Sequence, residues 1–284
     1  MKNIIKLFVS VLIIQLMLTT AEAQSVKNIT ILHTNDTHSR IEQLSATDKK
    51  YPNRAGYANR SAVISKIRSE QPNVLLVDAG DFLQGTPYFN FFKGALEVEL
   101  MNKLGYKAVT LGNHEFDLGV DSLAKILKKA KFSIVNCNYD VKNTPLRKIV
   151  KPWIIVKIAG VKIGITGVGV NPEGLITPEN FKGIVYHEPA GALNKVANML
   201  KKDKKCDFVI CLSHLGYQQP DGIISDVSIV KKCNNIDLIV GGHTHTLLER
   251  PDSVVDMSGK KVYVVQSGSM GVSIGRMDVG FSKK

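Results

Sequence analysis

Five short clusters of side chains that commonly bind metal ions stand along the sequence, and each follows a short apolar run. The clusters are HTNDTH at residues 33–38, DAGD at 78–81, GNHEFD at 112–117, SH at 213–214 and GGHTH at 241–245. Asp36 and His38 are two residues apart, so in an extended chain they point to the same side and could share one ion. Imidazole nitrogens, carboxylates and amide oxygens together suit divalent ions such as Zn, Mn or Fe. The clusters therefore predict a metal site assembled from distant parts of the chain.

The apolar runs before these clusters alternate with amphipathic segments, which is typical of an α/β protein with largely parallel sheets. We expect strands at residues 28–32, 74–77, 108–111, 133–136, 208–212, 237–240 and 263–266, and helices at 56–68, 96–104, 121–129 and 190–201. Residues 154–157 and 162–166 flank Gly160 and predict a hairpin. Together these patterns favour a four-layer αββα sandwich of two mixed sheets. Ligands gather at the carboxyl ends of strands in such sheets, so the metal site should lie there.

The first 23 residues have the pattern of a secretory signal peptide. A basic start precedes the apolar run Ile4–Leu18, and Ala21-Glu22-Ala23 offers small residues around a cleavage point. The apolar run has 15 residues, fewer than the roughly 20 that span a bilayer. We therefore expect cleavage, a periplasmic or secreted protein without a stable membrane span, and one large domain at residues 24–284.

The chain carries a formal net charge of +12. A basic surface raises the local concentration of anionic ligands. However, the lysines stand in scattered pairs, and no aromatic residues are interleaved with them as in a nucleic-acid groove. A solvated lysine-rich surface is thus favoured, and no nucleic-acid partner is expected.

The four cysteines do not form a metal-binding or redox motif, because none has CxxC or Cys-His spacing. Cys206 and Cys233 each precede an apolar run that resembles a neighbouring strand, so they could pair. Cys137 and Cys211 fall inside predicted strands and fit small core residues. The sequence leaves the pairing open.

In their order along the chain, the five clusters resemble those of the calcineurin-like metallophosphoesterases. The longer strings HTNDTH, VDAGDFLQGTP, TLGNHEFDLG, SHLG and GGHTH are similar to the 5′-nucleotidase branch of that superfamily. The resemblance extends from about Ile29 to Gly280. It implies an enzyme that hydrolyses nucleotide 5′-phosphates, with two divalent metal ions (Zn, Mn or similar) and a hydroxide between them as the nucleophile.

The resemblance also implies a role for nine residues. One ion would be held by Asp36, His38, Asp81 and His245, and the other by Asp81, Asn113, His214 and His243, with Asp81 as the bridge. His114 would stabilise the transition state or protonate the leaving oxygen. Asp117, three residues further on, would orient the His114 ring if the segment forms one helical turn.

Longer 5′-nucleotidases of this branch have a second, C-terminal domain that binds the nucleobase, and the expected catalytic domain fills residues 24–284. Either a separate C-terminal-domain protein supplies that function or base selectivity is weak. With the same metal centre, the protein could instead be a 2′,3′-cyclic nucleotide phosphodiesterase, a 3′-nucleotidase or a UDP-sugar hydrolase. A more distant alternative is a metal-containing binding module without catalysis.

Overall fold

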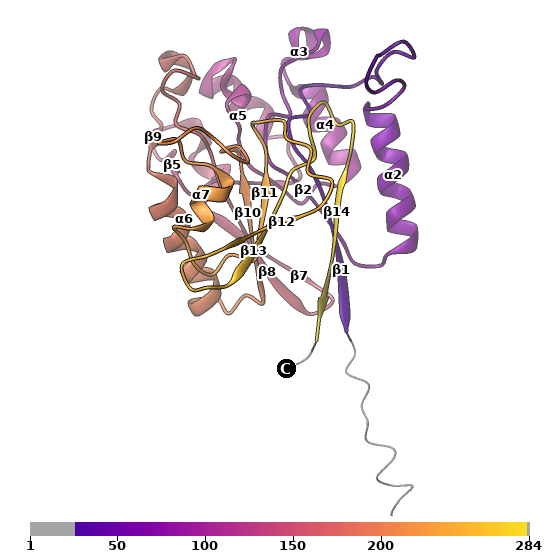
Figure 1. Cartoon of the computed structure of the whole chain (residues 1–284). Coiled ribbons are helices and arrows are strands. Elements are labelled where there is room, and N and C mark those ends of the chain that lie inside the picture. The colour runs from indigo at the N-terminus through magenta and orange to yellow at the C-terminus, as the bar shows by residue number, and fades with distance from the viewer. Residues whose placement is uncertain (1–25, 283–284) are drawn as a thin grey trace, which may run out of the picture.

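Two six-stranded sheets lie face to face in the computed structural model, which describes residues 26–282 (Figure 1). The first sheet has the order β14 (Gly275–Phe281), β1 (Lys27–Thr34), β2 (Val74–Asp78), β3 (Ala108–Val109), β4 (Ser133–Val135) and β6 (Val150–Lys151). Only β14 is antiparallel to its neighbour, β1. The carboxyl ends of β1, β2 and β3 therefore meet at one edge of the sheet.

The second sheet has the same mixed character. Its order is β12 (Asp252–Val255), β13 (Lys261–Val265), β11 (Leu238–Gly241), β10 (Phe208–Ser213), β8 (Val161–Val168) and β7 (Trp153–Ile158). The four inner strands are parallel, whereas β12 and β7 are antiparallel to their neighbours. A short pair, β5 (Tyr139–Asp140) and β9 (Val185–Tyr186), stands apart from both sheets.

Helices cover the outer faces of both sheets. Those of the first half are α2 (Tyr57–Glu70), α3 (Pro87–Phe92), α4 (Ala95–Leu104) and α5 (Gly119–Leu127), and those of the second are α6 (Pro189–Asn198) and α7 (Asp226–Val230). A π-helical turn at Met199–Asp203 extends α6. Short 3₁₀ turns occupy His114–Phe116, Pro145–Lys148 and Pro178–Phe181.

The two sheets and the helices on their outer faces form four layers, and three apolar layers lie between them. In β1, Ile29 and Ile31 face the second sheet and pack with residues such as Ile163, whereas Leu32 faces the helices of the first half. The third layer joins β10 and β11 to α6 and α7. Successive side chains of a strand point to opposite faces, so strands buried on both faces read as continuous apolar runs. The predicted αββα sandwich is confirmed.

Several elements were not predicted from the sequence, namely α3, α7, β5, β6, β9, β12 and β14. The strand expected at residues 108–111 ends at Val109. All four cysteines lie within the described residues and are free, so the suggested Cys206–Cys233 pair does not form. The predicted signal peptide lies outside the described residues, and no helix within residues 26–282 has the length and apolar character to cross a bilayer.

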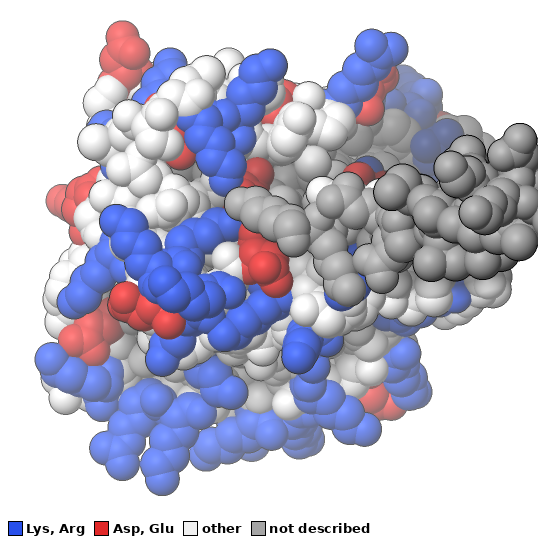
Figure 2. Space-filling model, turned by 90° about the horizontal axis from the view of Figure 1, so that it is seen from below, with Lys and Arg blue, Asp and Glu red and all other residues white. Residues whose placement is uncertain are grey.

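Much of the positive charge gathers at one end of the molecule. Figure 2 views the lower end of Figure 1, where the parallel strands begin, and shows Lys and Arg side chains crowded over it. Lys162, Lys201 and Lys204 lie together there, since the Nζ of Lys162 donates to the carbonyl of Lys204 and that of Lys201 donates to the carbonyl of Asp207. The five sequence clusters lie at the other end of the strands, so this charge does not surround them.

The two sheets approach each other closely at Gly167 of β8. A Cβ at this position would lie 2.3 Å from the carbonyl oxygen of Val135 in β4 and 2.4 Å from Thr110 Oγ1. Gly167→Ala should therefore force the sheets apart and cost about 1–3 kcal/mol, which lowers the melting temperature by roughly 3–10 °C. Gly191→Ala in α6 is the matched control, because its Cβ would have no contact closer than 3.7 Å. Thermal unfolding of both variants checks the prediction, and an unchanged melting temperature for Gly167→Ala would contradict it.

Candidate active site

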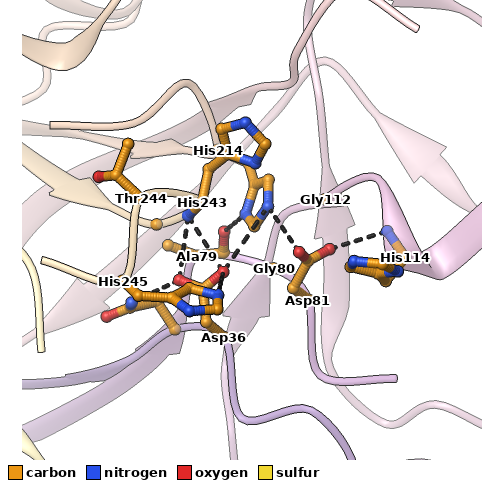
Figure 3. Close-up of polar contacts among 12 residues, drawn as sticks. Asp36, Ala79, Gly80, Asp81, Gly112, His114, His214, His243, Thr244 and His245 are labelled. Carbon is orange, nitrogen blue, oxygen red and sulfur yellow. Dashed lines mark hydrogen bonds and ion pairs between the residues drawn. The ribbon is translucent and has the colours of Figure 1, made fainter. Parts of the chain in front are cut away.

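The five clusters meet where strands of both sheets end (Figure 3). Asp36 and His38 follow β1, Asp81 follows β2, and Asn113 and His114 follow β3 of the first sheet. From the second sheet, His214 follows β10, and His243 and His245 follow β11. Every residue that the sequence assigned to the site is therefore found at one end of the sandwich.

The first group consists of Asp36, His38 and His245, whose candidate ligand atoms lie within 4.8 Å of one another. The two Nε2 atoms of His38 and His245 are 2.9 Å apart. Asp36 Oδ1 lies 4.0 Å from the first and 3.5 Å from the second. Three ligand atoms thus converge from two sheets.

The second group consists of Asp81, His214 and His243, also within 4.8 Å. His214 Nε2 lies 3.0 Å from Asp81 Oδ2 and 3.9 Å from Asp36 Oδ1, so this histidine connects the two groups. Asn113 is 8% exposed, and its Oδ1 is buried without a hydrogen-bond partner among the described residues. The amide oxygen is thus available for a ligand.

The donor atoms of the second group fit a cation. His214 Nδ1 lies 2.7 Å from the carbonyl oxygen of Ala79, and only a proton on Nδ1 makes this contact a hydrogen bond. Nε2 of the neutral ring then directs a lone pair towards Asp81, and it has no hydrogen-bond partner in the described structure. Two buried acceptors 3.0 Å apart repel one another unless positive charge lies between or beside them.

The pKa of His214 shows the same demand for positive charge, whereas that of His243 shows that its ring stays neutral. Burial lowers the pKa of His214, but the carboxylate of Asp81 outweighs it and raises this pKa to about 10. Burial and the neighbouring His214 lower the pKa of His243 to about 4. A divalent ion can supply the charge that the carboxylates attract while both rings stay neutral.

The loops that carry the candidate ligands have unusual backbone conformations. Five of these residues have positive φ angles, namely Asp36 (49°), His38 (44°), Asp81 (56°), His243 (72°) and His245 (54°). Non-glycine residues rarely adopt this region, and each such conformation costs free energy that the surrounding structure must offset. At Gly112 a Cβ would lie 2.2 Å from Asp81 Oδ1, so only glycine admits the carboxylate there.

Two polar side chains, neither of which the sequence analysis singled out, hold these strained loops. Asn35 donates from Nδ2 to Asp36 Oδ2 at 2.6 Å, and its Oδ1 accepts from the backbone N–H of Ser267 at 2.9 Å. Gln266 donates from Nε2 to the carbonyl of Gly242, and its Oε1 accepts from the backbone N–H of Thr246 at 2.7 Å. Asn35 lies in the first cluster and Gln266 lies outside all five, and the sequence indicates a positioning role for neither. Their hydrogen bonds in the folded chain show this role.

Glu115 joins the loop after β2 to the loop after β3. Its Oε2 accepts from the backbone N–H groups of Asp81 at 2.8 Å and Gly112 at 2.6 Å. Its Oε1 accepts from Phe82 at 3.0 Å and Leu83 at 3.2 Å. Although burial and the charge of Asp81 raise the pKa of Glu115 to about 8, four donors that point at both oxygens favour the carboxylate. Glu115 lies in the GNHEFD cluster, but no function was predicted for it from the sequence.

His114 and Asp117 form a pair beside the two groups. His114 Nδ1 lies 3.0 Å from Asp117 Oδ2 across one 3₁₀ turn, and each side chain is about one third exposed (33% and 34%). The hydrogen bond to Asp117 raises the pKa of His114 against the opposing effect of burial. The backbone N–H of His114 also donates to Asp81 Oδ1 at 2.9 Å, so the pair is fixed relative to the second group. The contact expected from the sequence is present.

A model of the calcineurin-like phosphoesterase family matches residues 29–247. The chain therefore belongs to this family, whose members use divalent metal ions. It is 34% identical to 5′-nucleotidase of Rattus norvegicus over 278 residues, which is 90% of this chain and 47% of that protein. It is also 30% identical to the trifunctional nucleotide phosphoesterase protein YfkN of Bacillus subtilis, over 90% of this chain and 18% of that protein.

Solved structures share the fold. The 5′-nucleotidase precursor from Thermus thermophilus superposes with a TM-score of 0.79 at 33% identity, over 90% of this chain and 52% of that one. The calcineurin-like phosphoesterase YfkN from Bacillus subtilis gives a TM-score of 0.77 at 27% identity, over 92% of this chain and 87% of that one. The chain spans about half the length of most of the curated relatives it matches, among them the rat enzyme at 47%.

Glu115→Gln should weaken metal binding, because one acceptor oxygen becomes an NH₂ group that faces backbone N–H donors. Loss of a carboxylate that orients a ligand typically costs about 10–100-fold in metal affinity. Titration with Mn or Zn, followed by calorimetry, measures the effect. The control is Glu99→Gln, which only removes an exposed ion pair with Lys103 on α4 and should bind metal as the wild type does. Equal affinities for the two variants would rule out a positioning role for Glu115.

Proposed function

We propose that this chain hydrolyses nucleotide 5′-phosphates to nucleoside and inorganic phosphate. The observation that carries the proposal is the convergence of two metal-binding groups and the His114–Asp117 pair on one end of the sandwich. Names of relatives such as the rat 5′-nucleotidase support nucleotides as the substrates. The name of YfkN, a trifunctional nucleotide phosphoesterase, keeps a cyclic nucleotide phosphodiesterase or 3′-nucleotidase as the second candidate.

Seven residues would hold two divalent ions. Asp36, His38, Asp81 and His245 would bind one, and Asp81, Asn113, His214 and His243 the other. When bound, such a pair lowers the pKa of water and neutralises charge on the phosphoryl oxygens. Zn or Mn suits this set of nitrogen and oxygen donors.

His114 is proposed as the acid. Because Nδ1 is engaged by Asp117, the other ring nitrogen remains to hold a proton towards the substrate. The oxygen of water bonds to phosphorus and gives up a proton to solvent, while the bond from phosphorus to the 5′ oxygen breaks. The 5′ oxygen takes the proton from His114, which then regains one from solvent. Asp117 does not touch the substrate; it orients the ring and favours its protonated form.

Export and a protein partner complete the proposal. Ile4–Leu18 and the small residues before Gln24 support a cleaved signal peptide and a periplasmic or secreted location. A separate polypeptide with a 5′-nucleotidase C-terminal domain is proposed to act together with this chain. A UDP-sugar hydrolase or a non-catalytic binding module remains the alternative to the enzyme proposed here.

A substrate panel tests the proposed activity. The protein, loaded with Mn, Zn or Mg, should convert AMP to adenosine and phosphate faster than it dephosphorylates 3′-AMP, opens 2′,3′-cyclic AMP or cleaves UDP-glucose, with the products separated by chromatography. Prior treatment with a chelator should abolish turnover, and returning the metal should restore it. Faster hydrolysis of a cyclic or 3′ nucleotide would favour the second candidate, and no hydrolysis of any of these substrates would leave the binding module.

His114→Ala should lower kcat by at least ~10²-fold, as expected for loss of a general acid, while the metal content stays that of the wild type. Asp117→Asn leaves only a neutral amide oxygen as acceptor, which weakens the hydrogen bond and removes the negative charge that raise the pKa of His114. The protonated ring is the active form, so kcat should begin to fall at a lower pH in this variant. A pH profile of kcat for all three proteins checks the assignment. Wild-type turnover in His114→Ala would remove this residue from the mechanism.

A further inference from the structure

Lysines from both sheets come together at the end of the molecule where the parallel strands begin (Figure 2). Lys157 of β7 and Lys162 of β8 occupy directly opposed positions beside the turn that joins these strands. Lys27 of β1 reaches the same turn, since a Cβ at Gly160 would lie 2.9 Å from its Nζ. Like charges at directly opposed positions destabilise a sheet. The fold thus contains a repulsion that an anionic partner would relieve.

Few carboxylates balance these lysines. Asp237 forms ion pairs with Lys201 at 2.8 Å and with Lys260, while Asp207 accepts a hydrogen bond from a backbone N–H of β8. Six other lysines at this end have no ion pair within residues 26–282, and we call them the basic face: Lys27, Lys107, Lys157, Lys162, Lys202 and Lys204. Their charge is therefore available to a ligand.

The helices account for only part of the positive charge. α2, α4, α5 and the π-helical turn after α6 each end a few residues before a parallel strand begins, so four helix C-termini meet at this end. Each C-terminus carries about half a negative charge, roughly −2 in all. Basic residues in their last turns already balance this charge, namely Arg68, Lys103, Lys125 and Lys201. The lysines at the strand starts and beside the β7–β8 turn are not explained by helix stabilisation.

A hollow at the same end also has a positive lining. This pocket of about 520 Å³ lies where α5 ends and β4 and β6 begin. No Asp or Glu lines it, and its charged residues are Lys128, Arg147, Lys148 and Lys151. Phe132 and Ile134 contribute buried apolar surface to its wall. Cations beside an apolar wall suit the phosphate of a lipid headgroup and the carbon atoms attached to it.

We propose that the basic face binds the surface of a membrane that contains anionic phospholipids. Lysine is a flexible point charge, which suits a fluid array of phosphates, whereas bidentate recognition of one phosphate favours arginine. The proposed signal peptide precedes β1, and β1 begins at this end with Lys27. The segment that would cross the membrane during export therefore adjoins the basic face.

The proposal also fixes which end of the molecule faces away from the lipid. The metal-binding groups lie at the opposite ends of the parallel strands. Docking through the basic face would leave them open to solvent and to dissolved substrates. The inference concerns binding alone, so it holds or fails independently of the proposed activity.

Co-sedimentation with vesicles tests the proposal. The processed chain, residues 24–284, should bind vesicles of phosphatidylcholine with phosphatidylglycerol in about 0.1 M salt, but not vesicles of phosphatidylcholine alone. Raising the salt to about 1 M shortens the screening length from about 10 Å to about 3 Å and should release the protein. In Lys157→Gln/Lys202→Gln/Lys204→Gln the partition coefficient should fall ~100-fold, because each lysine near an anionic membrane contributes roughly fivefold.

Lys49→Gln/Lys93→Gln/Lys182→Gln is the matched control, because it removes the same charge from exposed lysines that follow the carboxyl ends of strands. It should bind vesicles as the wild type does, and both variants should keep the wild-type melting temperature. Equal binding by the two triple variants, or binding of the wild type to both kinds of vesicle alike, would overturn the inference. Binding to a DNA duplex without binding to anionic vesicles would also overturn it, in favour of a nucleic-acid surface.

Discussion

Ligand atoms crowded against one another are the constraint on which the metal-binding end of the molecule depends. His214 Nε2 and Asp81 Oδ2 lie 3.0 Å apart in a fully buried contact. These two atoms would repel one another unless a proton or a metal ion supplies positive charge. His38 and His245 bring their Nε2 atoms within 2.9 Å nearer the surface, where one ring can donate to the other. A divalent ion in either group would supply the positive charge that these crowded nitrogens and carboxylates attract.

The rest of the structure holds these groups in place. The ligand loops have strained, left-handed backbone conformations, and the free energy they cost is offset by packing elsewhere. The three apolar layers fix the two sheets, while Glu115, Asn35 and Gln266 tie the loops to each other through backbone hydrogen bonds. The sandwich is therefore the support, and these three polar side chains set the final position of the ligands.

The strands could be predicted from the sequence because both sheets are buried on both faces, so that strands such as β2 and β10 appear as continuous apolar runs. The ligands could be named because Asp, His and Asn directly follow such runs. By contrast, β14 alternates half-buried and exposed residues at a sheet edge and gave little apolar signal. Glu115 and Gln266 could not be given functions, since their partners are backbone groups that come close only in the folded chain. A pocket lined by Leu175, Ile223 and His243 likewise depends on separate loops whose approach no local pattern encodes.

The two sheets contribute to each metal-binding group, and His38 and His245 are 207 positions apart in the sequence. An extended or newly synthesised chain consequently offers no preformed coordination sphere, and the ions must arrive with or after the final docking of the sheets. The exported chain proposed above would cross a membrane before folding, so it would acquire its ions only after export. The divalent ions present in the destination compartment, and not those of the cytoplasm, would then determine its metal content.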